Sequence, residues 1–149
     1  MQKYLIKLFK RPTLEVVKLY WRIFRPETFG VKIILTHSNS ILLVKHTYGY
    51  NYTFPGGGIK KDEDKLEGVK REVKEELGIQ LSAIHYVGHL VSTRFYKKDN
   101  IFIYTSELFE RSFTVDALEI ESANWFGKNS LPKLSLTTQD IYDLYLKVV

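Results

Sequence analysis

The sequence predicts an α/β protein of the α+β kind, built in the order helix, strands, helix, strands, helix. Helical periodicity is found near both ends and in the middle of the chain, and runs of β-branched and aromatic residues fill the segments between. A length of 149 residues suits one domain with a sizeable core, and 44% hydrophobic and 26% charged residues are globular values. We find no internal repeat, low-complexity tract or linker.

Composition excludes several kinds of chemistry. The chain has no cysteine, which rules out disulfides, thiolate catalysis and cysteine-based zinc sites. No apolar run is long enough to span a membrane, and the first ten residues carry lysines where a signal peptide would be apolar. We therefore expect a cytoplasmic protein without a transmembrane segment.

The N-terminal segment carries the net charge of the chain. Residues 1–31 hold seven Lys or Arg and two Asp or Glu, a balance of +5, whereas the remaining residues hold fifteen of each. Pro12 suits the first turn of a helix that ends near Phe24, before Arg25-Pro26. Its apolar side would consist of Leu14, Val17, Tyr20, Trp21 and Phe24.

Two functions are open for this basic helix besides a structural one. It would suit a membrane surface or nucleic acid, or it would serve as a dimer element. We expect it to pack on the core with its lysines reaching outward, so that residues 1–29 form a basic helical extension and residues 30–149 form the main domain.

A hairpin and a glycine-rich loop come next. Residues 31–35 and 41–45 are short β-branched runs joined by a polar turn, a pattern that predicts a β-hairpin. The loop over 46–52 is rich in tyrosine. It leads into Phe54-Pro55 and three glycines at 56–58, which permit unusual dihedral angles and close approach of the backbone to a ligand.

The central helix is predicted over residues 65–77, with Gly78 as its C-terminal stop. Its apolar stripe consists of Leu66, Val69, Val73 and Leu77, which recur at steps of three and four.

Three glutamates lie beside that stripe. Glu72, Glu75 and Glu76 are spaced i, i+3 and i+4, so their side chains are neighbours on one flank of the helix. Two like charges about 4 Å apart repel by roughly 1 kcal/mol in water and about 4 kcal/mol in a partly buried site. Either the nearby lysines neutralise a solvated face, or a hard cation such as Mg²⁺, which prefers oxygen ligands, lies among them.

A second pair of strands is expected over 83–96 and 100–108, with a turn at 97–100. His85 and His89 are four residues apart in a strand and should point the same way, which would permit a histidine metal site. Residues 113–117 begin a loop before the segment 119–126. At the end of the chain, Thr137 and Asp140 resemble a capping box, and the helix to about Lys147 would bury Ile141, Leu144, Tyr145 and Val148.

The stretch from Gly57 to Ile79 resembles the signature of the Nudix hydrolases. That signature is G-x5-E-x7-R-E-U-x-E-E-x-G-U, where U is an aliphatic residue, and every fixed position is matched here. The lead-in Phe54-Pro55-Gly56-Gly57 is also similar to that of the family. The resemblance implies an α/β/α sandwich with a mixed sheet, which here carries an extra N-terminal helix.

The resemblance also implies a reaction and the residues that carry it. Family members hydrolyse the pyrophosphate linkage of nucleoside diphosphate derivatives with Mg²⁺, for which Mn²⁺ is a substitute. Metal ligands would come from the Gly56 carbonyl and the helix glutamates, with Glu119 as a further ligand. The general base would be Glu76 or Glu119. Glu121 is the second choice to Glu119 for the acid ahead of Trp125. Structural support would come from Gly57 and from an ion pair of Arg71 with Glu63. The full set expected at the site is Gly56, Gly57, Glu63, Arg71, Glu72, Glu75, Glu76 and Glu119.

The substrate is less defined by sequence than the reaction. Tyr48, Tyr50, Tyr52 and Tyr96 would stack on a base or pack in the structure, and Arg94 would meet phosphates. A (d)NTP, a dinucleoside polyphosphate and a nucleotide sugar all stay open. ADP-ribose is less favoured because no proline occurs between Pro55 and Pro132. RNA decapping is less favoured because no extra domain is evident.

Two other classes of function remain. The protein would be a non-catalytic Nudix-fold binding or regulatory module, or a peripheral membrane or nucleic-acid binder through its basic N-terminus. For the hydrolase we expect a small nucleotide as partner, no stable nucleic-acid complex, and a monomer or homodimer.

Overall fold

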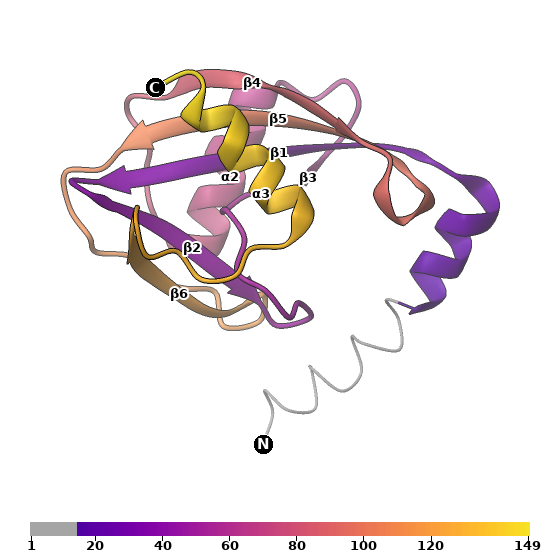
Figure 1. Cartoon of the computed structure of the whole chain (residues 1–149), viewed down its shortest axis with the longest axis horizontal. Helices are drawn as coiled ribbons and strands as arrows, with labels where there is room; N and C mark the ends of the chain where they lie inside the picture. Colours follow the sequence, from indigo (N-terminus) through magenta and orange to yellow (C-terminus); the bar gives the residue numbers. More distant parts are fainter. Residues whose placement is uncertain (1–14) are drawn as a thin grey trace.

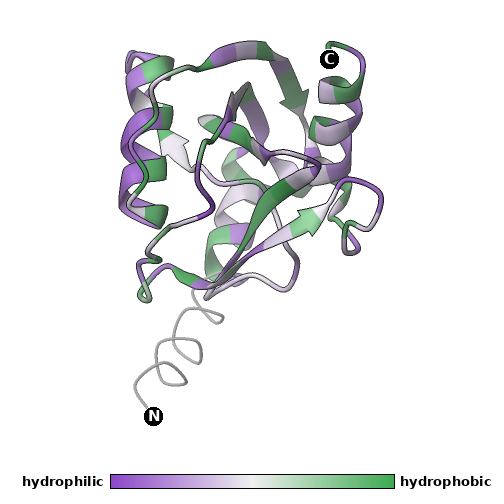
Figure 2. Cartoon of the chain, turned by 90° about the vertical axis from the view of Figure 1, so that its left-hand side faces the viewer, coloured by the Kyte–Doolittle hydropathy of each residue, from purple (hydrophilic) through white to green (hydrophobic). Residues whose placement is uncertain are grey.

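The computed structural model describes residues 15–149 and has the form of a three-layer sandwich (Figure 1). A six-stranded sheet forms the middle layer, with the order β4-β5-β1-β2-β6 and with β3 paired to β1. The helices α2 and α3 cover opposite faces of this sheet, as Figure 2 shows from the side. The predicted α/β/α sandwich is confirmed. The strands are β1 (Glu27–His37), β2 (Ser40–His46), β3 (Gly58–Ile59), β4 (His85–Ser92), β5 (Lys98–Glu107) and β6 (Ile120–Gly127).

The sheet is mixed because one central pair of strands is parallel. The strands β1 and β5 run in the same direction with Val31 opposite Phe102, whereas the other strand pairs are antiparallel. The predicted hairpin is present as β1 and β2, with Thr36 opposite Ile41. The central strands are buried on both faces, which explains their nearly continuous apolar sequence.

Helix α2 (Lys65–Leu77) has the bounds that the sequence predicts. The Asp64 carboxylate caps its first turn by accepting a hydrogen bond from the Glu67 N–H at 2.9 Å. Gly78 ends it in the left-handed conformation, φ 66°, and donates its N–H to the Lys74 carbonyl. The helix buries Val69, Val73 and Leu77 against the sheet, but Leu66 is exposed, so the predicted stripe loses its first member.

Helix α3 (Leu136–Leu146) covers the other face through Ile141 and Tyr145. Its N-cap is Ser135, whose hydroxyl accepts from the Thr138 N–H, so the predicted Thr137 and Asp140 capping box is wrong. Val148, expected to be buried, is exposed beyond the end of the helix.

The hairpin of β4 and β5 turns earlier than predicted. The turn occupies residues 93–97 and contains a short 3₁₀ segment, Arg94–Tyr96. Phe95 and Tyr96 both have positive φ, 58° and 61°, which large L-residues rarely adopt. Propensity assigns these aromatic residues to a strand, and for that reason the turn expected at 97–100 was misplaced.

A β-bulge in β4 separates the two strand histidines. Tyr86 and Gly88 face the consecutive residues Tyr104 and Ile103, so Val87 is an extra residue in the ladder. The extra residue reverses the alternation. His89 lies opposite Phe102 and stacks on it at 4.5 Å on the α2 side, whereas His85 lies opposite Thr105 and points to the other face. The expectation that the two histidines share a face is therefore wrong.

Residues 15–24 form a helix that lies beside the sandwich (Figure 1). The predicted start at Pro12 and the apolar Leu14 lie outside the described residues. The other apolar side chains of this helix are mostly exposed, so the packing on the core that we expected is not seen for residues 15–24. Within residues 15–149 no helix has both the length and the apolar character needed to cross a bilayer.

Candidate active site

The glycine-rich loop forms the floor of the site because it runs along the edge of β1. The Val31 N–H donates to the Gly57 carbonyl and the Ile33 N–H donates to the Pro55 carbonyl, both at 3.0 Å. Gly56 has φ 118°, and a Cβ on it would lie 2.3 Å from the Val31 carbonyl oxygen. Only glycine fits there, and the tight approach carries the loop directly under α2.

Glu76 is the most buried acid described, with 2% of its surface exposed. One carboxylate oxygen accepts from the Gly56 N–H at 2.9 Å, and the other lies 3.7 Å from His46 Nε2. Burial raises the pKa of Glu76 to about 7, although Lys32 and the Gly56 N–H both act to lower it. A carboxyl group with a pKa near neutrality is well suited to take up a proton.

Glu72 and Glu75 differ from Glu76 in their surroundings. The Glu72 carboxylate lies so close to Gly57 that a Cβ there would come within 2.3 Å of its Oε2. Burial raises the pKa of Glu72, against the lowering effect of Arg71. Glu75 is 59% exposed in its side chain and pairs with Arg71 at 3.2 Å. Glu72 and Glu76 are therefore largely buried at the loop, whereas Glu75 is exposed.

Arg71 and Glu63 make the contact that we expected between the charged loop and the helix. The Arg71 Nη2 donates to Glu63 Oε1 at 3.0 Å, and Nε donates to the same oxygen at 3.2 Å. Glu63 also accepts from the Lys60 N–H at 3.0 Å, and this bond, followed by Arg71, lowers the pKa of Glu63. The other arm of Arg71 donates to Glu72 at 2.7 Å. One guanidinium group thus fixes the loop and orients a glutamate of the cluster.

Glu119 is the acid of the following segment that lies near the cluster. Its negative charge acts to raise the pKa of both Glu76 and Tyr48. Its carbonyl accepts from the Thr47 N–H at 2.8 Å, which ties this loop to the end of β2. Glu121, our second choice, makes an ion pair with Lys45 at 3.7 Å instead.

Lys32 is a site residue that the sequence reasoning missed. Its ammonium group donates to the Gly56 carbonyl at 2.6 Å and to the Phe54 carbonyl at 2.9 Å. Burial lowers the pKa of Lys32, and the charges of Glu76 and Glu72 oppose that shift. The available signal was that Lys32 is the one charged residue in the apolar run 31–35.

The glutamates and the Gly56 carbonyl offer the oxygen ligands that a hard divalent cation prefers, and His46 Nε2 lies 3.7 Å from the Glu76 carboxylate. The Lys32 amine lies on the Gly56 carbonyl at 2.6 Å, within the field of Glu72 and Glu76. As the side chains stand, no three acidic or histidine groups within residues 15–149 converge on one point, since Arg71 holds Glu72 and Glu75. The residues present fit a metal ion once these side chains turn toward it.

Of the tyrosines, Tyr48 lies at the acid cluster. Its ring stacks on His46 at 5.0 Å, and burial, with the charges of Glu76, Glu119 and Glu72, raises its pKa to about 12. Tyr52 lies elsewhere, since its hydroxyl accepts from Asn124 at 2.9 Å and its ring packs on Phe126.

The two remaining substrate candidates lie in the β4–β5 turn and not among the glutamates. Arg94 pairs with Asp140 of α3. The ring of Tyr96 lies under Arg22 of the N-terminal helix at 5.6 Å. Tyr50 is largely exposed.

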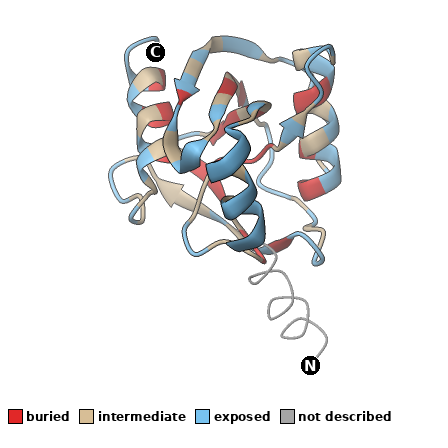
Figure 3. Ribbon diagram, turned by 90° about the vertical axis from the view of Figure 1, so that its right-hand side faces the viewer, coloured by how far each residue is buried: buried red, intermediate tan, exposed pale blue. Residues whose placement is uncertain are grey.

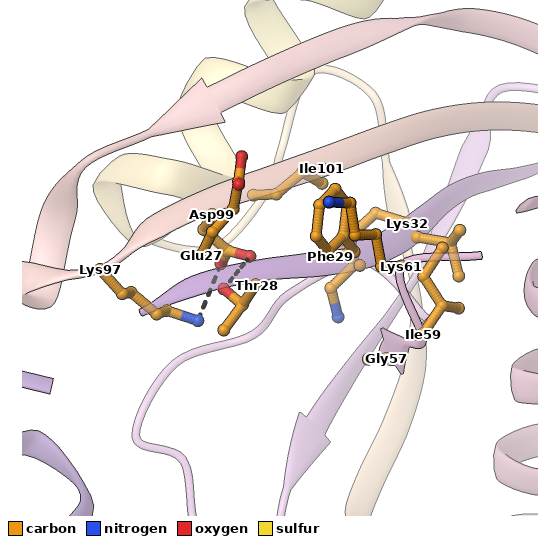
Figure 4. Close-up of a pocket in the computed structure, with 13 residues that line it drawn as sticks. Glu27, Thr28, Phe29, Lys32, Gly57, Ile59, Lys61, Lys97, Asp99 and Ile101 are labelled. Carbon is orange, nitrogen blue, oxygen red and sulfur yellow. Dashed lines mark hydrogen bonds and ion pairs between the residues drawn. The ribbon is translucent and has the colours of Figure 1, made fainter. Parts of the chain in front are cut away.

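A cleft of about 700 Å³ opens next to the glycine loop, along the first half of β1 (Figure 4). Lys32 and Gly57 belong both to its wall and to the acid site, so the two are continuous. Lys61 lies at the same end as Lys32, whereas Lys97 pairs with Asp99 at 2.9 Å at the far end. A cleft that joins lysines to clustered carboxylates suits an anionic ligand that brings a cation with it.

Comparison with known proteins agrees with this geometry. The NUDIX domain model matches residues 26–146. Nudix hydrolase 8 of Arabidopsis thaliana is 30% identical over 99 residues, covering 62% of this chain and 27% of that protein. The RNA pyrophosphohydrolase of Marinomonas sp. is 39% identical over 66 residues, covering 44% of this chain and 39% of that protein. The chain thus spans well under half the length of these curated relatives.

Solved structures share the fold at lower identity. A MutT Nudix hydrolase from Burkholderia pseudomallei has a TM-score of 0.71 and 22% identity, covering 79% of this chain and 97% of that chain. The MutT protein of Methanosarcina mazei Go1 has a TM-score of 0.73 and 19% identity, covering 83% and 96%. With a family model matched over most of its length and a complete signature on the loop and helix that form the acid site, this chain belongs to the Nudix family.

Proposed function

We propose that this protein is a divalent-metal-dependent hydrolase of the pyrophosphate linkage in nucleoside diphosphate derivatives, with Mg²⁺ as the metal and Mn²⁺ as a substitute. The observation that carries the proposal is Glu76, a buried carboxyl group with a pKa of about 7 that is held on the Gly56 N–H beside two further acids. A buried acid cluster of this kind costs stability, and a catalytic role accounts for that cost.

The reaction needs a water molecule to attack a negatively charged phosphorus. When bound, the metal neutralises phosphate charge and acidifies the water. Its proposed ligands are the Gly56 carbonyl and the carboxylates of Glu72, Glu75 and Glu76, with Glu119 as a further candidate. Arg71 and Glu63 act as positioning residues that hold the loop and orient Glu72.

The chain's own part in the step is proton transfer and orientation. The water oxygen bonds to phosphorus, the bridging P–O bond breaks, and the departing phosphate takes the electron pair. The water proton passes to Glu76 in our assignment, with Glu119 as the other candidate base. Lys32 lies at the junction of the acid site and the cleft, where its ammonium group would meet the phosphate chain.

For the substrate, the cleft favours a compact anionic nucleotide such as a (d)NTP, a dinucleoside polyphosphate or a nucleotide sugar. Tyr48 is the proposed aromatic contact, and Tyr52, Tyr96 and Arg94 are weaker candidates because other groups hold them. A second candidate is the 5′ phosphate chain of RNA. The names of two relatives favour it, the RNA pyrophosphohydrolase above and the mRNA-decapping enzyme subunit 2 of Saccharomyces cerevisiae, which is 32% identical over 110 residues.

The test is release of phosphate or nucleotide from a panel of (d)NTPs, dinucleoside polyphosphates, nucleotide sugars and 5′-triphosphorylated RNA, with and without Mg²⁺. We expect metal-dependent release, with ¹⁸O from labelled water in one phosphate product. Glu76→Gln should lower turnover by at least about 100-fold, in the range that a lost general base costs. The matched control is Glu67→Gln, an exposed glutamate of the same helix that pairs only with Lys70 among the contacts described.

The outcomes separate the two classes of function. If both variants turn over substrate like the wild type, the assignment of Glu76 is wrong. If the wild type binds metal and nucleotide in calorimetry but releases nothing, the protein is a binding module with the Nudix fold.

A further inference from the structure

The helix over residues 15–24 presents its apolar side to solvent. Leu19, Ile23 and Phe24 are 57%, 65% and 65% exposed, and Figure 3 shows this helix toward the viewer, coloured almost throughout as exposed. Its contacts with the sandwich come from its other side. Trp21 lies against Lys97, 4.6 Å from the ammonium group to the ring, and Arg22 lies over Tyr96.

The exposed side chains form one continuous stripe. The stripe advances along the helix in steps of three and four residues, from Val16 to Leu19 and Tyr20 and then to Ile23 and Phe24. The rings of Tyr20 and Phe24 contact each other with centroids 4.7 Å apart. Single exposed apolar residues are normal on a protein surface, but a contiguous apolar patch marks a place where something binds. The stripe consists of Val16, Leu19, Tyr20, Ile23 and Phe24.

Charge indicates which partner covers the stripe. Within the helix Lys18 pairs with Glu15 at 2.8 Å and Arg22 lies over Tyr96 of the sandwich. The excess positive charge comes from the sequence just before the helix, which adds Lys3, Lys7, Lys10 and Arg11, whereas residues 32–149 are neutral overall. A second copy is disfavoured, because two segments of charge +5 would repel each other across the interface. Nucleic acid is disfavoured, because binding to its phosphates uses the cations and leaves aliphatic side chains exposed.

The combination that fits both the stripe and its charge is a negatively charged lipid surface. Interfacial helices place aromatic and aliphatic residues at the level of the acyl boundary, and flanking lysines and arginines contribute about 1 kcal/mol each near an anionic leaflet. We propose that residues 15–24 are an interfacial anchor that lays the apolar stripe on an anionic lipid bilayer. The anchor joins the rim of the cleft, since Lys97 both contacts Trp21 and lines the cleft.

The test is co-flotation of the full chain with vesicles of phosphatidylcholine alone or with roughly 30% phosphatidylglycerol, a negative surface comparable to a cytoplasmic leaflet. We expect binding to the anionic vesicles at least about tenfold tighter than to the neutral ones. The double variant Ile23→Ser, Phe24→Ser should lower that binding about tenfold or more, since it removes two of the five stripe residues. The matched control is Phe109→Ser, Leu136→Ser, two apolar side chains of similar or greater exposure on other parts of the surface.

A second readout does not depend on flotation. In a Trp21→Phe, Trp125→Phe, Phe24→Trp variant the one tryptophan lies on the stripe, and its emission should shift to the blue when anionic vesicles are added. Failure of the wild type to bind the anionic vesicles overturns the proposal, as does equal loss of binding in the stripe variant and in the control. A concentration-dependent dimer that only the stripe variant abolishes would assign the stripe to a second copy. Salt-dependent RNA binding with the same mutational pattern would assign it to nucleic acid.

Discussion

Helix α2 and the helix over residues 15–24 are both amphipathic, yet they use their two sides in opposite ways. Helix α2 buries Val69, Val73 and Leu77 against the sheet and carries its acids on a flank that faces the glycine loop. The N-terminal helix attaches through Trp21 and Arg22 and leaves its apolar stripe in solvent. Amphipathic periodicity therefore indicates where the apolar side of a helix lies, but not what that side contacts.

The largest difference between the two helices should appear in core truncation. Leu77→Ala removes a fully buried side chain of α2, and we expect the free energy of unfolding to fall by about 2 to 5 kcal/mol. Leu19→Ala removes an exposed side chain of the same type and should change it by less than about 0.5 kcal/mol. Urea titration of both variants checks this, and equal losses would mean that the N-terminal helix packs on another part of the fold.

Next in size is the cost of burying Glu76 without metal. Because its folded pKa is about 7 and its ordinary value is 4.5, the folded state keeps the proton that the unfolded state releases between these values. The protein without metal should therefore lose stability as pH rises from about 5 to 8, by at most about 3 kcal/mol. Glu76→Gln should remove most of this loss, so that the variant is more stable than the wild type at pH 8 but not at pH 5.

Denaturation in EDTA at the two pH values measures this effect. Glu75→Gln, whose side chain is 59% exposed, is the control on the same helix and should leave the pH dependence unchanged. If Glu76→Gln is instead the less stable protein at pH 8, then Lys32 and the Gly56 N–H stabilise the carboxylate by more than burial costs.

A smaller effect on stability is expected at the ion pair that ties the charged loop to α2. Glu63→Gln should cost little unfolding free energy, because Arg71 and Glu63 are both partly exposed. Turnover should fall more, by about 10- to 100-fold, since Arg71 also orients Glu72. Steady-state kinetics measures the loss of turnover, and urea titration measures the loss of stability. If the loss of stability alone accounts for the loss of turnover, Arg71 and Glu63 have no positioning role.

The smallest effect is expected where the N-terminal helix meets the sandwich. Trp21→Leu removes the ring under the Lys97 cation, a contact worth about 0.5 to 1 kcal/mol, and leaves the Lys97–Asp99 ion pair in place. Global unfolding should not change, but the amides of residues 15–24 should exchange faster with deuterium. Unchanged exchange would mean that the Arg22–Tyr96 contact alone positions this helix.

Local sequence signals predicted those parts of the fold that depend on neighbouring residues. The bounds of α2 follow from the apolar period and Gly78, and the β1–β2 hairpin follows from two β-branched runs around a polar turn. Parts that depend on backbone irregularity were not predicted. The bulge at Val87 reversed the side of His89, and the positive φ of Phe95 and Tyr96 moved a turn.

The candidate site divides in a similar way. The motif indicated Gly56, Glu72 and Glu76, which the structure brings together. The motif did not indicate Lys32, because its two carbonyl partners come from a loop more than twenty residues away and meet it only when that loop pairs with β1. The assigned roles of these residues stay predictions for the experiments above, as do the division at residue 29, the cytoplasmic location and the oligomeric state.

The parallel pairing of β1 with β5 has a consequence for how the molecule folds. Paired residues such as Thr28 and Asp99 are separated by 71 positions, so this central contact forms only after a long chain segment closes. Pairings of such sequence separation raise the contact order of a domain and slow its folding. The glycine loop and α2 both lie inside the segment that closes, and Lys32 of β1 makes the contact with the Gly56 carbonyl. The acid site should therefore acquire its final arrangement together with the central sheet and late in folding, which pulse-labelled hydrogen exchange would detect as late protection of the Gly56 amide.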